Sequence, residues 1–113
     1  MKVHEFLPLT FAVYHILIAL SEGKRHGYGI IQEIEAQTDG RLRMPPGTLY
    51  GAISRLVERG LIEELETEAD ERRRYYQLTE LGKQVMVAEA QRLEELVNLA
   101  RSKRVLPITG DTL

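Results

Sequence analysis

The hydrophobic and polar positions of the chain form three successive helical patterns in its first half. Apolar residues at one helical face predict a first helix over about Leu9–Ser21, and an isoleucine stripe predicts a second over about Tyr28–Thr38. A third helix is predicted to start after the Pro45-Pro46-Gly47 turn and to stop at Gly60. Its expected buried stripe consists of Leu49, Ile53, Leu56 and Val57.

Two short strand patterns follow the third helix. They cover Leu61–Glu66 and Arg73–Leu78, and the acidic segment Thr67–Glu71 between them contains neither Gly nor Pro, so a long tip is expected and not a tight turn. Three helices followed by a hairpin is the order of a winged helix-turn-helix. The predicted fold class is therefore mainly α with a small β-hairpin.

A last, long helix is predicted from Thr79, a good N-cap, to about Arg104, with Pro107 limiting it. Its apolar residues step by 4, 3, 4 and 3 from Met86 to Ala100, which is the spacing of a coiled-coil seam. Such a helix is too long for this small domain to cover, so a homodimer is predicted, with an intramolecular core as the alternative. The predicted dimerisation residues are Val85, Met86, Ala90, Leu93, Leu96, Val97 and Ala100.

These patterns divide the chain into a winged helix-turn-helix domain (1–79), a dimerisation helix (80–105) and a flexible tail (106–113). The 113 residues suit one globular domain, and the lack of cysteine excludes disulfides and thiolate metal sites. The longest apolar stretch, Phe11–Leu20, is too short to span a bilayer, and the N-terminus does not have the pattern of a signal peptide. A cytoplasmic protein without membrane contact is expected. The three histidines have no metal-ligand spacing, and no cofactor is expected.

The formal net charge of −2 argues mildly against a nucleic-acid partner, but the cations are clustered. The N-terminal polar residues of a helix can reach base edges in the major groove, and a wing can bring cations to phosphate. For Tyr28, core packing or one phosphate hydrogen bond is favoured over base contact. The predicted DNA-contacting residues are Lys24, His26, Tyr28, Arg41, Arg43, Gly47, Thr48, Tyr50, Ser54, Arg55, Arg72, Arg73 and Arg74.

Four motifs follow one another along the chain: His26-Gly27-Tyr28-Gly29-Ile30, Gly47-Thr48-Leu49-Tyr50, the stretch Arg55-Leu56 to Leu61-Ile62, and Arg73–Thr79 with Gly82. In this order they resemble the motifs of the PadR family of regulators. The resemblance covers about Leu9–Gly82 and implies a dimeric repressor that binds a pseudo-palindromic operator in double-stranded DNA. The single C-terminal helix resembles that of the short branch of the family.

Two departures from the family pattern concern the third helix, which is expected to contact bases in the major groove, and the effector. Gly51 stands where many members have Pro, and the chain has no Trp, the residue with which the multidrug-sensing branch holds flat aromatic ligands. A small hydrophobic effector of another kind, bound between the C-terminal helices and the winged domains, is the remaining hypothesis.

Two other classes of function compete with DNA binding. A winged-helix module that binds protein is the alternative, because the hairpin is acidic and the net charge is negative. An enzyme is least favoured, because the sequence has no nucleophile–base pair and no phosphate-cradling glycine motif.

Overall fold

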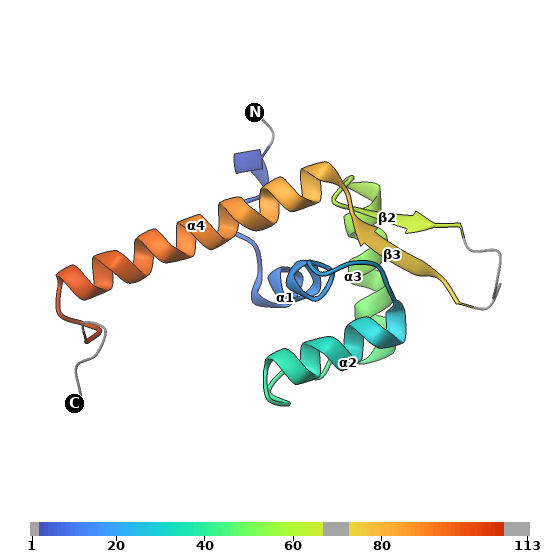
Figure 1. The fold of residues 1–113 in the computed structure, drawn as a ribbon, viewed down its shortest axis with the longest axis horizontal. Coiled ribbons are helices and arrows are strands. Elements are labelled where there is room, and N and C mark those ends of the chain that lie inside the picture. Colours follow the sequence, from blue (N-terminus) through green and yellow to red (C-terminus); the bar gives the residue numbers. More distant parts are fainter. Residues whose placement is uncertain (1–2, 67–72, 108–113) are drawn as a thin grey trace.

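The structure, a computed structural model, describes residues 3–66 and 73–107. Four α-helices and three short strands follow one another over these residues (Figure 1). In chain order the elements are η1 (Val3–Phe6), α1 (Phe11–Ala19), β1 (Arg25–His26), α2 (Gly27–Gln37), α3 (Pro46–Glu58), β2 (Ile62–Leu65), β3 (Tyr75–Leu78) and α4 (Glu80–Ser102).

The helices begin where a side chain accepts a hydrogen bond from one of their first N–H groups, or where a proline, which has no N–H, stands at the first position. Thr10 caps α1 by accepting a hydrogen bond from the N–H of Val13 at 3.1 Å, so this helix starts two residues later than predicted. Pro46 is the first residue of α3, which places Thr48 inside the first turn. Thr79 caps α4 as predicted, since its hydroxyl accepts from the N–H of Gly82 at 3.0 Å.

The three strands form one antiparallel sheet in the order β1-β3-β2. β2 and β3 are the predicted hairpin, although β3 begins at Tyr75 and not at Arg73. β1 is an addition to the prediction: Arg25 pairs with Tyr76 and His26 with Tyr75. The central strand therefore ties the start of α2 to the hairpin.

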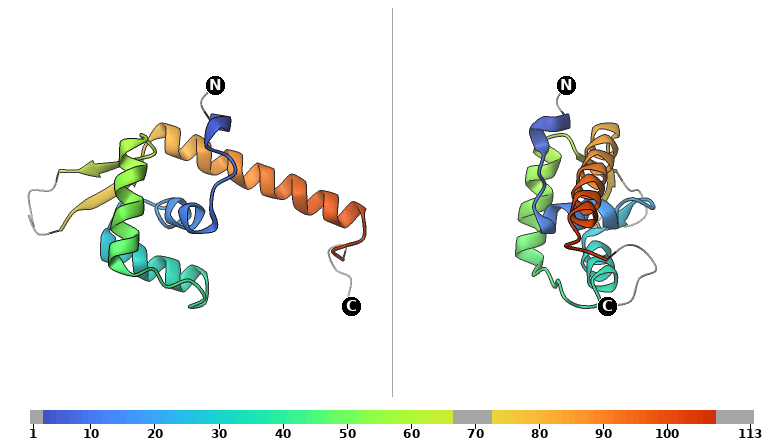
Figure 2. Two further views of the ribbon diagram at one scale, coloured as in Figure 1. Left: turned by 180° about the vertical axis from the view of Figure 1, so that it is seen from behind. Right: turned by 90° about the vertical axis from the view of Figure 1, so that its left-hand side faces the viewer.

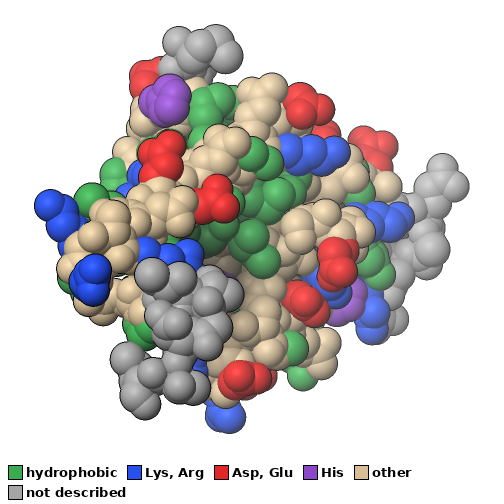
Figure 3. All heavy atoms as spheres, turned by 60° about the vertical axis from the view of Figure 1, so that its left-hand side comes forward, with side chains coloured by type: hydrophobic (Ala, Val, Ile, Leu, Met, Phe, Trp, Pro, Cys, Tyr) green, Lys and Arg blue, Asp and Glu red, His purple; other side chains and the backbone are tan. Residues whose placement is uncertain are grey.

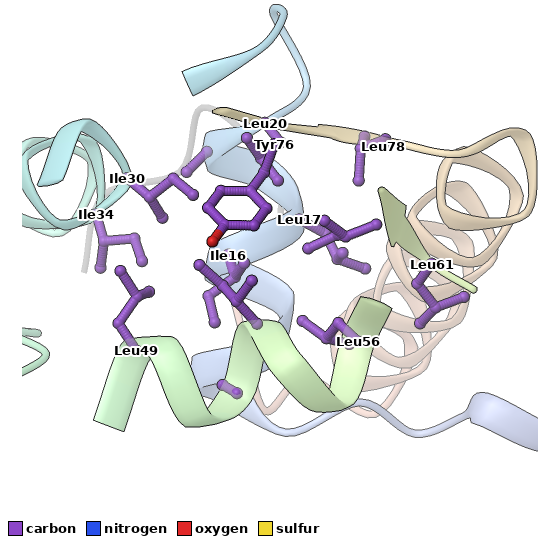
Figure 4. Packing of buried hydrophobic residues seen from close by; sticks show 14 of the residues in the cluster. Ile16, Leu17, Leu20, Ile30, Ile34, Leu49, Leu56, Leu61, Tyr76 and Leu78 are labelled. Atoms are coloured by element: carbon purple, nitrogen blue, oxygen red, sulfur yellow. The ribbon is translucent and has the colours of Figure 1, made fainter. Parts of the chain in front are cut away.

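The core lies where α1, α2, α3 and the sheet meet. Figure 4 shows the ring of Tyr76 from β3 among Ile16 and Leu17 of α1, with Leu49 and Leu56 of α3 on the side of the third helix. Leu49, Ala52, Ile53 and Leu56 are the buried face of α3. The prediction that Val57 belongs to it was wrong: Val57 is 37% exposed, because the 3.6-residue period places Ala52 on the buried face and turns Val57 to its edge.

The turn from α3 into β2 is closed by backbone hydrogen bonds around Gly60. The N–H of Gly60 donates to the carbonyl of Val57 at 3.1 Å, and that of Leu61 to the carbonyl of Leu56 at 2.9 Å. Gly60 has φ of +83°, the left-handed conformation that this helix ending requires. Gly82 matters for a different reason, because a Cβ there would collide with the carbonyl of Leu61. The start of α4 is thereby held directly against the end of α3.

The first half of α4 packs on the domain, and its second half projects beyond it (Figures 1 and 2). Val85 is fully buried in the core of its own chain. The prediction that Val85 belongs to the dimer seam was therefore wrong. The spacing of apolar residues along a helix does not show whether the same chain or a partner chain buries them. Exposed apolar residues follow further along, with Leu96 at 54% and Leu99 at 53% exposure.

Glu89 is the one acidic residue buried among the described residues, with 2% exposure. Arg92 binds it through two hydrogen bonds, Nε to Oε1 at 2.8 Å and Nη2 to Oε2 at 2.9 Å. These hydrogen bonds, and a further one from the backbone of Leu9, hold the pKa of Glu89 below its ordinary value against the opposing effect of burial. The same carboxylate raises the pKa of the Tyr14 phenol, after the larger effect of burial. Glu89 thus connects α4 to the segment that leads into α1.

This arrangement is a winged helix with a long C-terminal helix, and it confirms the predicted fold class. Among the described residues, none of the helices is both long and apolar enough to cross a bilayer.

We expect Glu89→Gln to lower the free energy of unfolding by about 1–3 kcal/mol near neutral pH, because it removes charged hydrogen bonds inside the protein. A lowered folded-state pKa gives stability that is complete above the ordinary value of 4.5 and is lost as pH falls through the folded value. The difference between wild type and variant should therefore shrink in acid. Urea unfolding across a pH series measures it, and a difference that stays constant into acid would contradict this role of Glu89.

Candidate nucleic-acid interface

Three segments far apart in the sequence meet beside the wing. The start of α2, the side chain of Tyr50 from α3 and the segment entering β3 line a surface hollow of about 160 Å³. Figure 1 shows the start of α2 lying below β3, close to α3. The residues that line the hollow are His26, Gly27, Tyr28, Tyr50, Arg73 and Arg74.

The start of α2 is shaped by His26 and Gly27. The N–H of Gly29 donates to Nδ1 of His26 at 3.0 Å, so the imidazole is the N-cap of α2. Gly27 is buried, and a Cβ at this position would overlap the phenol ring of Tyr50. Only glycine leaves Tyr50 its present place against the end of α2. The amides of that helix end carry partial positive charge, which favours an anion beside them.

Cations surround this helix end from the side of the wing. Lys24 Nζ lies 5.6 Å from the centre of the Tyr75 ring, and Arg74 Nη1 lies 3.7 Å from Oε1 of Glu64. Arg73 and Arg74 are exposed and precede β3, and Arg72 lies outside the described residues. Arg73 and Arg74 therefore bring positive charge to a hollow that a helix N-terminus already makes attractive to anions, and Glu64 offsets part of the charge of Arg74.

The outer face of α3 carries the predicted reading residues. Gly47, Thr48, Ser54 and Arg55 are all exposed, and the buried face of α3 lies opposite. Tyr50 and Ser54 are one helical turn apart and share a side of the helix. This is the polar, uncovered helix face that a major groove accepts.

The other predicted contacts are Arg41, Arg43 and Tyr28. Arg43 Nε binds Oε1 of Glu35 at 2.9 Å, and neither Arg41 nor Arg43 lines the hollow. Tyr28 lines the hollow and is 62% exposed, so the alternative of core packing was wrong, while its phosphate hydrogen bond stays a prediction. The second position of α2 faces away from the core because Ile30 and Ile34 take the buried side.

Tyr76 lies behind the hollow with its phenol neutral. Burial raises the pKa of this phenol, and the nearby Glu64 and Tyr50 raise it further, against a smaller lowering by Arg74. Tyr75 and Tyr76 point to opposite sides of β3, one half-buried and one in the core, as expected for neighbours in a strand. Within residues 3–66 and 73–107, no three His, Asp or Glu side chains are placed to hold a metal ion.

Sequence reasoning did not include Gly27 and Tyr75 among the site residues. Gly27 supports Tyr50, and the Tyr75 ring contacts Lys24 and stands edge-on to the His26 ring at 5.6 Å. The signal for Gly27 was its place between His26 and Tyr28 in a motif. Tyr75 gave no such signal, because its role depends on pairing with β1.

The model of the Transcriptional regulator PadR-like family matches residues 16–88 of this chain. Among solved structures, a transcriptional regulator from Clostridium thermocellum is similar at 30% identity, covering 81% of this chain and 88% of that one, with a TM-score of 0.69. A complex structure of RosR from H. salinarum is similar at 25% identity, with coverage of 93% and 97% and a TM-score of 0.69.

Bacillus subtilis PadR in complex with operator DNA shares the fold, at 23% identity and a TM-score of 0.62 over 70% of this chain and 47% of that one. A search of curated proteins gives no significant match.

We expect Gly27→Ala to displace the Tyr50 ring while costing less than about 1 kcal/mol of stability, because the clash is with the far end of a flexible side chain. Contacts between the Tyr50 ring and residue 27 in nuclear Overhauser spectra, together with thermal unfolding, measure both effects. Gly47→Ala is the matched control, since a Cβ there meets nothing within 4 Å. A Tyr50 ring that keeps its contacts in Gly27→Ala would show that this glycine does not position it.

Proposed function

The chain belongs to the PadR-like family of transcriptional regulators, and on that premise we propose that it represses transcription by binding a pseudo-palindromic operator as a homodimer. The observation that carries the proposal is the convergence of Tyr50, Tyr28, Arg73 and Arg74 on the N-terminus of α2, beside the uncovered face of α3. The operator complex of Bacillus subtilis PadR, which has the same fold, supports double-stranded DNA as the ligand. The protein acts in the cytoplasm and carries out no reaction.

In this proposal the parts of the interface have separate tasks. Tyr50, Ser54 and Arg55 of α3 contact base edges, while the start of α2 and the wing arginines hold phosphates on either side. Gly47 and Thr48 bring the first turn of α3 close to the backbone of the DNA, and Arg41 and Arg43 add charge beside it. Lys24 extends the phosphate contact from the loop before β1.

A homodimer follows from the uncovered half of α4. In the single chain, the residues with seam spacing that follow Met86 are half-buried or exposed. They are Ala90, Leu93, Val97 and Ala100. Leu96 and Val97, at 54% and 38% exposure, stand where the helix has left the domain. Figure 3 turns the side of the molecule that bears the free end of α4 toward the viewer, and hydrophobic side chains are exposed between charged ones on this face. A second copy of α4 would cover Leu96 and Val97 and would place two copies of α3, the proposed recognition helix, on one operator.

Release by a small hydrophobic effector completes the proposal. A hollow of about 350 Å³ lies between the N-terminal segment and α4, bordered by Leu7, Pro8 and Ala88. A ligand there, or between the two α4 helices, would alter the angle between the seam and the winged domain. The distance between the two recognition helices would change with it.

We expect Tyr50→Ala and Arg55→Ala each to weaken operator binding at least about tenfold, the size of one lost base contact. Fluorescence anisotropy with the DNA upstream of the protein's own coding region measures it, between about 50 and 200 mM salt, where phosphate contacts predict a steep fall in affinity. Lys103→Ala, which removes one positive charge beyond the end of α4, is the control and should bind like wild type. Equal, weak and salt-independent binding by all of these proteins would favour a protein partner for the winged helix.

We expect Leu96→Asp to convert the dimer to monomer, because a charge would be buried in the apolar seam. Val87→Asp is the matched control: Val87 is 51% exposed, near the 54% of Leu96, but lies nine residues away and hence on the opposite side of α4. Sedimentation velocity over a concentration series distinguishes the two. A wild-type monomer, or dissociation by Val87→Asp alone, would refute the proposed seam.

A further inference from the structure

His26 occupies a junction on which the whole interface converges. It is the last residue of β1, it pairs with Tyr75 of β3, and it caps α2 through the hydrogen bond from Gly29 to its Nδ1 at 3.0 Å. The next residue, Gly27, lies directly against the ring of Tyr50, which fills the space that a Cβ would take. A change in the His26 ring is therefore a change in the support of a DNA-reading side chain.

The hydrogen bond from Gly29 determines the protonation state of the ring. A nitrogen that accepts a backbone N–H has no proton of its own, so this cap requires a neutral His26 with its proton on Nε2. An imidazolium has a proton on both nitrogens and cannot cap the helix. The Tyr75 ring stands edge-on to the imidazole, with 5.6 Å between the two ring centres.

Charged and titratable groups from several elements surround His26. Lys24 lies before β1, and Arg73 and Arg74 lie before β3, while the N-terminal end of α2 adds partial positive charge. Tyr28 of α2, Tyr50 of α3 and Tyr75 of β3 are the other titratable neighbours. Two carboxylates lie among these cations: Glu33 binds Arg25 at 3.4 Å, and Glu64 lies 3.7 Å from Arg74.

We propose that His26 is a proton switch for DNA binding, a role that rests on the proposed operator binding. Neutral His26 holds the start of α2, and with it Gly27 and Tyr50, in the conformation that binds DNA. Protonation breaks the cap, the first turn of α2 frays, and Tyr50 loses its support. The free protein tolerates this fraying and the DNA complex does not, so acid lowers the population that can bind.

The affinity of wild type for the upstream duplex should fall about two- to fourfold from about pH 8 to about pH 6, because an imidazole gains its proton over this range in competition with the cap hydrogen bond. His26→Asn keeps a capping side chain that does not titrate, so its affinity, whatever its value at the higher pH, should stay constant on acidification. The double variant His4→Gln/His15→Gln removes the other two histidines and should keep the pH dependence of wild type.

A second measurement is independent of DNA. Long-range ¹H–¹⁵N spectra of the free wild-type chain should show the His26 proton on Nε2, and the Gly29 amide signal should move as the ring titrates. If wild type binds no DNA even at the higher pH, the proposed function fails and these spectra still test the cap.

The proton switch is overturned if His26→Asn loses affinity in acid as wild type does. It is also overturned if wild-type affinity rises on acidification, which would mean that phosphate attraction to the imidazolium outweighs the cap, or if the proton lies on Nδ1.

Discussion

The pairing of β1 with β3 is the constraint on which the interface depends. It is only two residues long, Arg25 with Tyr76 and His26 with Tyr75, yet it fixes where α2 begins relative to the wing. β3 pairs with β2 on its other side, and β2 is joined to α3 through the Gly60 turn. The recognition helix, the N-terminus of α2 and the wing are therefore held by one central strand. A shift of β3 by one residue would turn Tyr76 out of the core and separate His26 from Tyr75.

Much of the fold was predictable because each helix carries its apolar residues on one face and ends at a recognisable signal. Thr79 as the cap of α4 and Gly60 at the end of α3 are local features, and both predictions were confirmed. β1 was not predictable, since two residues cannot show an alternating pattern. The predictions for Val57 and Val85 failed for a related reason. A stripe of apolar residues in the sequence shows which side of a helix is apolar. How far the buried side extends, and which chain buries it, depend on tertiary packing.

The candidate site divides in the same way. The helical period of α3 predicts that its polar face, which includes Ser54, is exposed. The contact between Tyr50 and Gly27 could not be predicted in this way, because it depends on the angle between α2 and α3. Glu89 illustrates the limit most clearly, because an acidic residue in the middle of a polar helix pattern is expected in water. Its burial depends on Arg92 and on the backbone of Leu9, which the fold brings to it. The formal charge of −2 was equally uninformative about the site, since the cations gather at one end of α2.

The division of α4 into a buried and an uncovered half has a mechanical consequence. Val85 and Glu89 fix the first half to the winged domain, and Gly82 brings it into contact with the backbone of Leu61 next to α3. A helix of 23 residues is about 34 Å long, so its free half is a lever attached firmly to the domain that holds the recognition helix. In the proposed dimer a small rotation at the seam is then carried to α3 as a rigid movement, because close-packed contacts do not absorb it. In the proposed proton switch, the His26 cap acts at the other end of the same domain and changes only the local shape of the surface that would contact DNA. On these two proposals, the spacing of the half-sites and the affinity within each half-site are controlled by different parts of the chain.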